Sequence, residues 1–357
     1  MDEAVIGMKC ITVGSRLIGS GYPTFIIAEA GVNHDGNVEK AKKMIDVAVA
    51  AGADAVKFQT FTGETLASKD AQLATYHKKG AVSEKETLKE LLKRLELNKE
   101  EHIVLFEYAR SRGIMIFSTP FDEKSVDVLE ELGVDLYKIA SFSLTNYPLL
   151  RYIALKNKPM IMSTGLHTLG EIEEAVKVIY ETGNIQLALL HCTSHYPITA
   201  ADANLRTMNT LRSAFDVPVG YSDHTMGITI TLASVALGAS IVEKHFTLNI
   251  QDRGVDHDAS ISPAELYNLV QGIRDIEAAF GSSRKIIPEI EKEIQKVHRP
   301  SLVSRVDIAA GTVLSEEMIT IKKPGTGIHP RDFSWVVGRK ATVAIEADRL
   351  IKKDDLE

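Results

Sequence analysis

Eight times along this chain of 357 residues, a short apolar run of β type ends in a reactive polar side chain and is followed by a stretch with helical spacing. The runs span residues 25–28, 55–56, 114–117, 136–137, 160–162, 187–190, 217–221 and 241–242. The polar residues that close them are Glu29, Lys57, Gln59, Ser118, Thr119, Lys138, Ser163, Thr164, His191, Ser222, Asp223, His224, Glu243, Lys244 and His245. Strands separated by helices predict a parallel sheet with right-handed crossovers. The repeat therefore predicts an α/β fold, a (β/α)8 TIM barrel with its chemistry at one rim, and an open doubly wound sheet is the competing architecture.

Helical spacing between the strands supports this architecture. Residues 38–51 carry apolar side chains at intervals of three and four, and Gly52 follows as a natural C-cap. The same pattern, closed by glycine, occurs over 99–112, 123–132, 169–181 and 225–237, and a last barrel helix is expected over 262–280.

The chain is longer than a barrel requires. A barrel of this class takes roughly 250 residues, and a charged run follows the last expected helix. We therefore predict a catalytic barrel over 1–284, a linker over 285–296 and a second domain over 297–357. Short β-rich runs at 302–303 and 342–345, punctuated by Gly and Pro, predict a small, mostly β tail. Its own core is marginal, which favours docking on another surface.

Composition excludes several classes of protein. The net charge of −7 argues against a general nucleic-acid surface, which needs clustered Lys and Arg. Cys10 and Cys192 are too few and too far apart for a disulfide framework, which favours a reducing cytoplasm. Residues 1–15 show no signal-peptide core, and no stretch reaches the roughly 18 apolar residues of a membrane span. We expect a cytoplasmic protein without nucleic-acid or membrane partners.

Residues 62–98 interrupt the repeat. The segment is polar, contains Lys78, Lys79 and Gly80, and is far longer than an ordinary connection between strand and helix. Long loops at a catalytic rim often act as lids. A surface excursion with its own helices is the alternative.

His224 and His245 follow consecutive strands and are expected to converge across the barrel mouth. Two neutral imidazoles in one cleft suit a divalent metal. Hydrogen-bonded structural histidines are the alternative for each residue alone. The chain has no HExxH, no HxH at the first strand and no paired CxxC, so zincin, amidohydrolase and structural zinc sites have little support.

Lys57 and Lys138 each follow apolar strand residues, where an unpaired ammonium is costly. Structural salt bridges to Glu29 or Glu243 are one explanation. Hydroxyl groups on the same rim favour another, in which the two cations bind a phosphate or a carboxylate. These hydroxyls belong to Ser141, Ser163 and Ser222.

Two carboxylates complete the predicted rim. Glu29 ends the first strand and is the obvious group to move a proton, although it could equally be a counter-ion. Asp256, in the glycine-containing loop 252–260, is a candidate for binding a ligand hydroxyl, with a solvated aspartate as the alternative. A phosphate loop at 31–36 lacks the following Lys, and a hydrolase elbow at 220–224 lacks its second glycine.

The strand ends carry a specific set of motifs: FIIAEAGVNHDG (25–36), DAVKFQTF (54–61), FSTPF (117–121), YKIAS (137–141), STG (163–165), HCTSHYP (191–197), GYSDHT (220–225) and EKHFT (243–247). Together they resemble the sialic acid synthase family, which condenses phosphoenolpyruvate with an N-acetylated hexosamine to give a nonulosonic acid. DIAAGTVL (307–314), KKPGTGIHP (322–330) and VGRKA (337–341) resemble the antifreeze-like (SAF) domain that closes these synthases. The resemblance covers nearly the whole chain.

The resemblance implies a transferase that joins phosphoenolpyruvate, an acetamido sugar and water and releases phosphate. It implies a divalent metal held by His224 and His245, usually Mn²⁺, with Mg²⁺ or Co²⁺ as alternatives, while Glu29 handles the proton or water. The residues implied for phosphoenolpyruvate are Lys57, Thr119, Lys138, Ser141, Ser163, Ser194 and Ser222. Those implied for the sugar are Gln59, Tyr196, Asp256 and Lys323. A domain-swapped homodimer is also implied, with each tail domain over the other subunit's barrel.

Two positions depart from the family pattern. Members that use N-acetylmannosamine often have a glutamate where this chain has Ser143, and an arginine where it has Lys323. Lysine offers a point charge without the planar fork of arginine. These changes leave the condensation intact. The identity of the sugar stays open, with N-acetylmannosamine, a diacetamido relative and a spore-coat or surface-glycan precursor as the alternatives.

Two other functions stay open. A phosphoenolpyruvate aldol synthase acting on a phosphorylated aldose needs a second phosphate site, and the strand ends show no Arg-rich cluster. A non-catalytic sugar-binding relative is disfavoured, because Glu29, both lysines and both histidines are all present.

Overall fold

The structure is a computed structural model that describes residues 10–68, 70–73, 80–81, 83 and 86–357. The chain forms two compact units, Met1–Gly281 and Ser282–Glu357.

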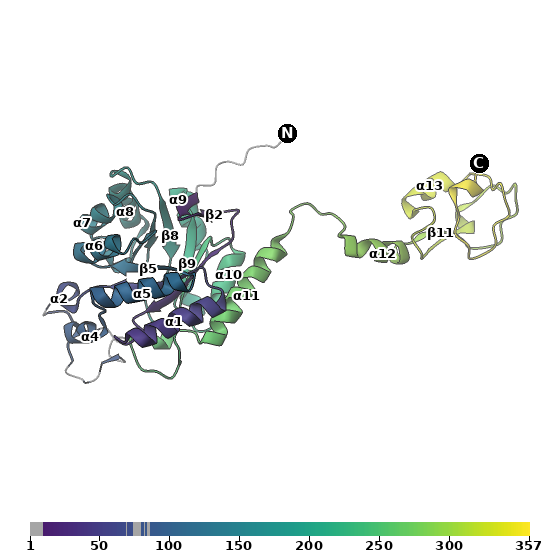
Figure 1. Ribbon diagram of the computed structural model, residues 1–357. Coiled ribbons are helices and arrows are strands. Elements are labelled where there is room, and N and C mark those ends of the chain that lie inside the picture. The colour runs from purple at the N-terminus through teal and green to yellow at the C-terminus, as the bar shows by residue number, and fades with distance from the viewer. Residues whose placement is uncertain (1–9, 69, 74–79, 82, 84–85) are drawn as a thin grey trace. The chain divides into compact units, whose positions relative to one another are not determined.

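The first unit is built on an eight-stranded parallel sheet that curls into a nearly closed barrel (Figure 1). The strands are β3 Phe25–Gly31, β4 Ala55–Thr60, β5 Met115–Pro120, β6 Tyr137–Ile139, β7 Met160–Ser163, β8 Leu187–His191, β9 Val219–Asp223 and β10 Ile241–His245. They follow the order β5-β4-β3-β10-β9-β8-β7-β6, with β5 lying beside β6. The predicted barrel is therefore confirmed. Its register pairs His245 with Glu29 and Glu29 with Lys57, which brings these three positions to one level of the barrel.

Helices alternate with the strands and lie around them (Figure 1). They are α1 Val38–Ala51, α2 Gly63–Leu66, α4 Leu88–Leu95, α5 Lys99–Ser111, α6 Glu123–Glu131, α7 Tyr147–Ala154, α8 Leu169–Tyr180, α9 Thr207–Phe215, α10 Thr229–Ala236 and α11 Pro263–Phe280. Capping boxes at Thr87, Asn98, Thr168 and Ser262 set the starts of α4, α5, α8 and α11. Helix α1 is capped by Gly52, whose φ of 78° is left-handed, and the sequence predicts this C-cap.

One helix begins later than its spacing predicts. The pattern predicts a helix from residue 225, but α10 starts at Thr229. The cause is Thr225, whose backbone N–H and hydroxyl donate to the Asp223 carboxylate at 2.8 and 3.1 Å. These bonds hold the chain in a turn before the helix can start.

A hairpin closes the amino-terminal end of the barrel. Strands β1 Cys10–Val13 and β2 Arg16–Gly19 pair antiparallel. Their buried residues Ile11, Val13 and Ile18 join a core cluster with the first residues of three barrel strands, Phe25, Ala55 and Ile241. This hairpin was not predicted from the sequence. Because it covers one end of the barrel, the carboxyl ends of the strands remain as the place for a site.

The second unit has a small core of its own. It contains α12 Glu289–His298, β11 Ser301–Ser304, β12 Ile319–Lys322 and α13 Phe333–Val336, and β11 pairs antiparallel with β12. Its buried apolar residues are Leu302, Ile308, Leu314, Ile319, Ile328, Val336, Ala341, Ile345 and Ile351. Of the two predicted β-rich runs, 302–303 lies in β11. In 342–345, only Ile345 makes an isolated bridge, to Ile308.

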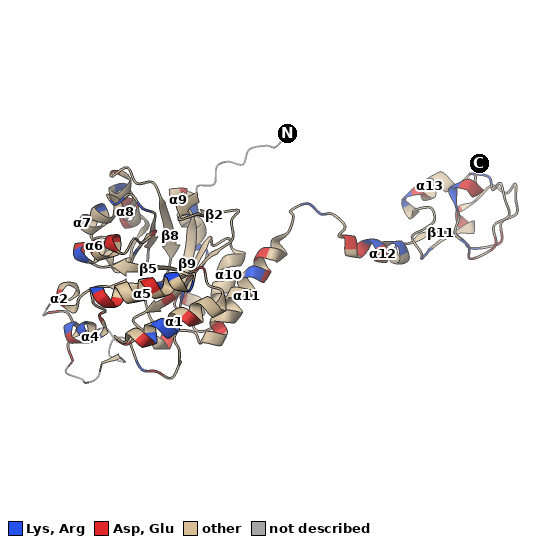
Figure 2. Ribbon diagram, in the orientation of Figure 1, with Lys and Arg blue, Asp and Glu red and all other residues tan. Residues whose placement is uncertain are grey.

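Charged residues of both signs are interspersed along α1, α5 and α12 (Figure 2). In α12, Lys292 pairs with Glu289 and Lys296 with Glu293, each three residues apart. The charged run expected to be a linker therefore contains a helix. Within the described part of the chain, no helix is both long and apolar enough to cross a membrane.

Candidate active site

A cavity of about 520 Å³ lies where the barrel strands end. It is lined by all the barrel residues to which a catalytic, metal-binding or substrate-binding role was assigned from the sequence: Glu29, Lys57, Gln59, Thr119, Lys138, Ser141, Ser163, Ser194, Tyr196, Ser222, His224, His245 and Asp256. The remaining selected residue, Lys323, belongs to the second unit, where its Nζ donates to His298 Nδ1 at 2.9 Å.

The base of the cavity contains a buried ionic cluster. Lys57 Nζ lies 2.6 Å from Glu29 Oε2 and 3.7 Å from Glu243 Oε2. Lys138 Nζ lies 3.6 Å from Glu243 Oε1. All four side chains are at most 5% exposed. The salt bridges considered from the sequence are thus present, and both ammonium groups still face the cavity.

Hydroxyl groups surround these charges. Lys57 donates to Thr119 Oγ1 at 3.0 Å, and Lys138 donates to Ser163 Oγ at 2.6 Å. Ser222 donates to Glu243 at 2.8 Å. Fixed hydroxyls beside two cations form a site suited to an anion with several oxygen atoms.

The two buried glutamates have opposite pKa shifts. Burial raises the pKa of Glu29 to about 8, despite the nearby Lys57. Burial also disfavours the charged form of Glu243, but Lys138 and Lys57 outweigh it and lower its pKa to about 2. Glu243 is therefore the fixed anion of the cluster near neutral pH, and Glu29 is the carboxyl group able to exchange a proton there.

His224 and His245 lie together on one side of the cavity. Their ring centroids are 5.5 Å apart, and the Tyr196 ring lies 4.0 Å from His224 and 5.6 Å from His245. Burial lowers the pKa of His224 to about 4, and burial followed by the effect of His224 also lowers the pKa of His245. Both rings are therefore neutral near pH 7, the form that binds a metal.

The polar atoms around this pair also fit a divalent metal. His224 Nδ1 donates to the Thr193 carbonyl at 2.8 Å, which leaves the lone pair on Nε2. His245 Nδ1 and Asp256 Oδ2 are buried, have no hydrogen-bond partner within the described part of the chain, and lie 3.6 Å apart. Buried polar atoms without partners are costly unless a ligand satisfies them. Two neutral imidazoles beside a carboxylate are a suitable donor set.

Gly31 keeps this space open. A Cβ atom on Gly31 would lie 2.6 Å from Asp256 Oδ2, 3.3 Å from His245 Cε1 and 3.4 Å from Glu29 Oε1. Its φ of 52° is left-handed, so the backbone also favours glycine here. The carboxylates and the imidazole thus converge on a position that a larger residue would fill.

Comparison with known proteins identifies the family. The sequence profile of the NeuB family matches residues 44–285, and that of the SAF domain matches residues 299–357. The chain belongs to the NeuB family. The sequence resemblance is confirmed, and this NeuB-family chain is an enzyme of the sialic acid synthase type with a C-terminal SAF domain.

Named relatives match nearly the full length. The chain is 44% identical to the N,N'-diacetyllegionaminic acid synthase of Legionella pneumophila over 348 residues, which covers 96% of this chain and 98% of that protein. It is 36% identical to the mouse N-acetylneuraminate-9-phosphate synthase, with 96% of this chain and 95% of that protein covered.

A solved structure of the same family and one that shares only the fold match this chain. The N-acetylneuraminic acid synthetase of Leptospira borgpetersenii, in complex with citrate, matches with a TM-score of 0.72 and 37% identity, covering 80% of this chain and 95% of that one. A truncated 3-deoxy-D-arabino-heptulosonate 7-phosphate synthase of Thermotoga maritima shares the fold, with a TM-score of 0.58 at 18% identity.

The cavity in this NeuB-family chain also has an apolar wall. It comprises Val32, Leu66, Leu88, Leu92, Leu95, Phe121, Ala140, Phe142, Leu166 and Val255. Phe121 and Phe142 stack with centroids 5.0 Å apart and an interplanar angle of 9°. Helices α2 and α4 supply leucines from the 62–98 segment, which the sequence analysis considered as a lid. Lys78 and Lys79 of that segment lie outside the described residues.

Ser143 is buried and is not among the residues that line the cavity. Its side chain is 5% exposed and does not line the cavity, whereas Phe142 does. The reason is a 3-10 turn over Ser141–Ser143, in which the Ser143 N–H donates to the Ala140 carbonyl. At this turn the side chain that lines the cavity is thus the aromatic ring of Phe142.

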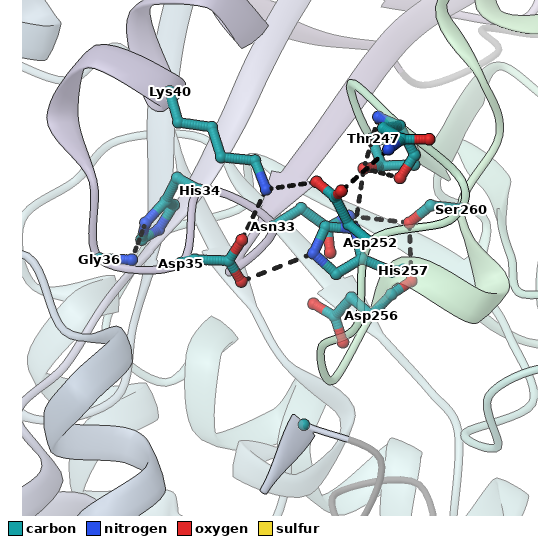
Figure 3. Close-up of polar contacts among 12 residues, drawn as sticks. Asn33, His34, Asp35, Gly36, Lys40, Thr247, Asp252, Asp256, His257 and Ser260 are labelled. Carbon is teal, nitrogen blue, oxygen red and sulfur yellow. Dashed lines mark hydrogen bonds and ion pairs between the residues drawn. The ribbon is translucent and has the colours of Figure 1, made fainter. Parts of the chain in front are cut away.

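A polar network holds the loop that carries Asp256 (Figure 3). Asn33 Nδ2 donates to the Phe246 carbonyl at 2.8 Å, and Ser260 Oγ donates to the Asp256 carbonyl at 2.7 Å. Asn33 Nδ2 also donates to Ser260 Oγ at 2.8 Å. The loop after β10 is thus fixed to the loop after β3.

The same two loops meet in an ionic group (Figure 3). Lys40 Nζ lies 2.5 Å from Asp35 Oδ2 and 2.8 Å from Asp252 Oδ2. His257 bonds Thr247 Oγ1 at 2.8 Å through Nδ1, and its Nε2 lies 3.5 Å from Asp35 Oδ1. The donor atoms of Asp35, Asp252 and His257 lie within 4.8 Å of one another, an arrangement that could hold a cation, and the Lys40 ammonium already supplies positive charge there.

Two parts of the site were not predicted from the sequence. Glu243 was considered only as a counter-ion, although it lines the cavity between the two lysines. The leucines of α4 were not selected at all. Their spacing gave the signal, because Leu88, Leu92 and Leu95 fall on one face of a helix.

Proposed function

We propose that this protein condenses phosphoenolpyruvate with an acetamido hexose and water to give a nonulosonic acid and phosphate, with the help of a divalent metal. The observation that carries the proposal is one cavity in which two buried lysines lie beside two neutral histidines. The alternation of cations, hydroxyls and imidazoles there fits an anionic donor next to a metal-bound carbonyl acceptor. The names of the relatives, which include synthases of legionaminic and neuraminic acids, support the same reaction class.

Phosphoenolpyruvate is assigned to the base of the cavity. With Glu29 largely protonated near pH 7, Lys57 and Lys138 outweigh the charge of Glu243 and leave an excess of positive charge for the donor. The hydroxyls that would bind its phosphate and carboxylate oxygens are those of Thr119, Ser141, Ser163, Ser194 and Ser222. Because these groups are fixed before the ligand arrives, they stabilise charge without reorganising.

Glu29 is assigned the proton transfer. It lies at the end of β3, and its Oε2 lies 2.6 Å from Lys57. A carboxyl group with a pKa of about 8 can accept a proton from an attacking water and return it later in the cycle. Glu243 is unsuited to this role because its pKa is about 2.

The metal is assigned to His224 and His245. When bound, a divalent cation such as Mn²⁺ would polarise the acceptor aldehyde as a Lewis acid. Residues of the chain near these histidines would bind the rest of the acceptor. Gln59, Tyr196 and Asp256 line the cavity around the histidines and would bind the sugar's polar groups.

The acceptor is proposed to be N-acetylmannosamine or a diacetamido relative. A phosphorylated aldose is the second candidate for this fold, but among the described residues no arginine lines the cavity. The full set of charged and imidazole groups also disfavours a non-catalytic sugar-binding role, because all of them converge on one cavity.

The test is phosphate release by the purified protein with Mn²⁺, phosphoenolpyruvate and each of several acetamido sugars. Release is expected only when both substrates are present, and chelation should stop it. Mass spectrometry of the product should show the donor carbons added to the sugar. Absence of release with every acetamido hexose, or release that persists after chelation and dialysis, would refute the proposal.

We further propose a homodimer in which the SAF domain of one subunit brings Lys323 to the barrel of the other. The proposal rests on the family resemblance and on the small core of the second unit. Sedimentation equilibrium should give twice the chain mass, and Lys323→Ala should raise KM for the sugar without changing KM for phosphoenolpyruvate.

A cytoplasmic location is proposed from the two free cysteines, Cys10 and Cys192.

A further inference from the structure

A second group of metal-binding side chains lies between the loop after β3 and the loop after β10 (Figure 3). It consists of Asp35, Asp252 and His257, and one ligand atom from each lies within 4.8 Å of the others. None of the three is among the described residues that line the active-site cavity. The two carboxylates are 34% and 33% exposed, so an ion can reach them from solvent.

The imidazole of His257 turns an unused nitrogen toward this group. The Thr247 hydroxyl donates to the Asn249 carbonyl at 3.2 Å, so its oxygen accepts the Nδ1–H of His257 at 2.8 Å. The lone pair of the neutral ring is then on Nε2. The His257 side chain is fully buried, and among the described residues its Nε2 has no hydrogen-bond partner. A buried acceptor atom without a partner is costly unless a ligand satisfies it.

The distance between the facing atoms fits a metal ion. His257 Nε2 lies 3.5 Å from Asp35 Oδ1, and two acceptors at this separation need a cation between them. Zinc binds nitrogen and oxygen ligands at about 2.1 Å in a tetrahedron, which places two such ligands about 3.4 Å apart. A nitrogen ligand beside carboxylates also favours Zn²⁺ over Mn²⁺.

Gly254 keeps the position between these atoms open. A Cβ atom on Gly254 would lie 2.4 Å from His257 Cδ2, 3.0 Å from its Nε2 and 3.4 Å from Asp35 Oδ1. A larger residue would therefore fill the space beside both ligand atoms.

The Lys40 ammonium does not use the same oxygen of Asp35. Its Nζ lies 2.5 Å from Asp35 Oδ2 and 2.8 Å from Asp252 Oδ2, whereas the His257 nitrogen faces Asp35 Oδ1. Two carboxylates beside one ammonium also keep an excess of negative charge, which attracts a divalent cation.

We propose that Asp35, Asp252 and His257 form a second metal site, for Zn²⁺ or a divalent ion of similar chemistry, in addition to the site assigned to His224 and His245. An ion bound there joins the loop after β3 to the loop after β10. The second loop also contributes a carboxylate to the active-site cavity, so the ion holds that part of the cavity wall in place.

The test is calorimetry with Zn²⁺ on the metal-free full chain. The double variant His224→Ala/His245→Ala removes both imidazoles of the active site and should still bind one Zn²⁺ per chain. In that background, Asp252→Asn replaces a charged ligand by a neutral group of the same shape, and Zn²⁺ affinity should fall by at least about tenfold. His257→Gln should show a similar loss.

Two controls separate the loss of a ligand from other effects. Asp127→Asn removes an exposed carboxylate on α6 that pairs with Lys156, and it should leave Zn²⁺ affinity unchanged. Lys40→Met breaks the same ion pairs as changes at the aspartates but keeps all three ligands. It should bind Zn²⁺ at least as tightly as its parent, because a neighbouring positive charge is gone.

The outcomes are distinct from those that test the synthase reaction. No Zn²⁺ binding by the double variant, or binding that Asp252→Asn and His257→Gln leave unchanged, would overturn the second site. An equal loss of affinity in Lys40→Met would assign the effect to the ion pairs and would also overturn it. Zn²⁺ binding as expected, without phosphate release by the unaltered protein, would refute the synthase reaction and retain the second site.

Discussion

Lys244 Nζ lies 3.0 Å from Asp223 Oδ2, and the two residues directly precede His245 and His224. Both are at most 1% exposed, and the register of β9 and β10 pairs them directly. Thr231 also donates to Asp223, at 2.5 Å. This buried pair therefore fixes the relative position of the two strand ends that carry the histidines.

Removing one partner of this pair should destabilise the protein. Lys244→Met leaves the Asp223 carboxylate buried without its cation, which typically costs about 3–5 kcal/mol. We expect a lower urea midpoint for the barrel and weaker Mn²⁺ binding in calorimetry. The control is Arg151→Met, which breaks an exposed pair with Glu181 and should leave both quantities nearly unchanged. A midpoint equal in the two variants would contradict the role of the buried pair.

Glu29→Gln tests proton transfer. Glutamine keeps the shape of the side chain but cannot accept a proton, so kcat should fall by roughly 100-fold or more. Because burial raises the pKa of Glu29 to about 8, its basic form accumulates as pH rises, and the wild-type rate should increase through pH 8. That rise should be absent in Glu29→Gln and present in Glu107→Gln, whose side chain is exposed on α5. An unchanged pH profile in Glu29→Gln would assign the proton to another group.

His224→Ala should abolish Mn²⁺ binding at the active site, because it removes one of two neutral imidazoles from the donor set. Calorimetry on metal-free protein measures the loss directly, without turnover. His102→Gln is the matched control. That histidine is also buried, but it bonds Thr60 and the Asn98 carbonyl and does not line the cavity. If His224→Ala retains full metal affinity, the metal lies elsewhere, with Asp35, Asp252 and His257 as the next group to test.

Lys40→Met should weaken the binding of the acceptor sugar and leave the binding of phosphoenolpyruvate unchanged. Lys40 joins Asp35 and Asp252, and so connects the loop that carries Asp256 to the start of α1. Without the ammonium, two aspartates repel each other and the loop is held less firmly. We expect KM for the acceptor to rise about 3- to 10-fold, an effect of roughly 1 kcal/mol, with KM for phosphoenolpyruvate unchanged. A fall in kcat with both KM values constant would instead indicate a purely catalytic effect.

The strands and their terminal side chains could be predicted from the sequence, since the length of each apolar run and the polar residue that follows it are local properties of the sequence. Glu29, Lys57 and His245 each end an apolar run, and a parallel barrel brings all such ends to one rim. The late start of α10 could not be predicted, because it depends on bonds from Thr225 to Asp223 that compete with helical ones.

The direction of side chains within turns could not be predicted from the sequence either. The motif after Lys138 suggested Ser143 as the altered sugar position, but the 3-10 turn buries Ser143 and exposes Phe142. The apolar wall was missed for a related reason. The four leucines of α4 predict an amphipathic helix, and only the tertiary structure shows that part of its apolar face borders the cavity.

The hairpin of β1 and β2 has a kinetic consequence. Since Ile11, Val13 and Ile18 close the amino-terminal end of the barrel, both substrates must pass through the same mouth. In the proposed function, phosphoenolpyruvate binds at the base of the cavity and therefore has to bind before the sugar. A sugar that binds second prevents phosphoenolpyruvate from leaving, and a sugar that binds first prevents it from entering. Steady-state kinetics should therefore show compulsory order, with the acceptor in excess acting as a competitive inhibitor of the donor.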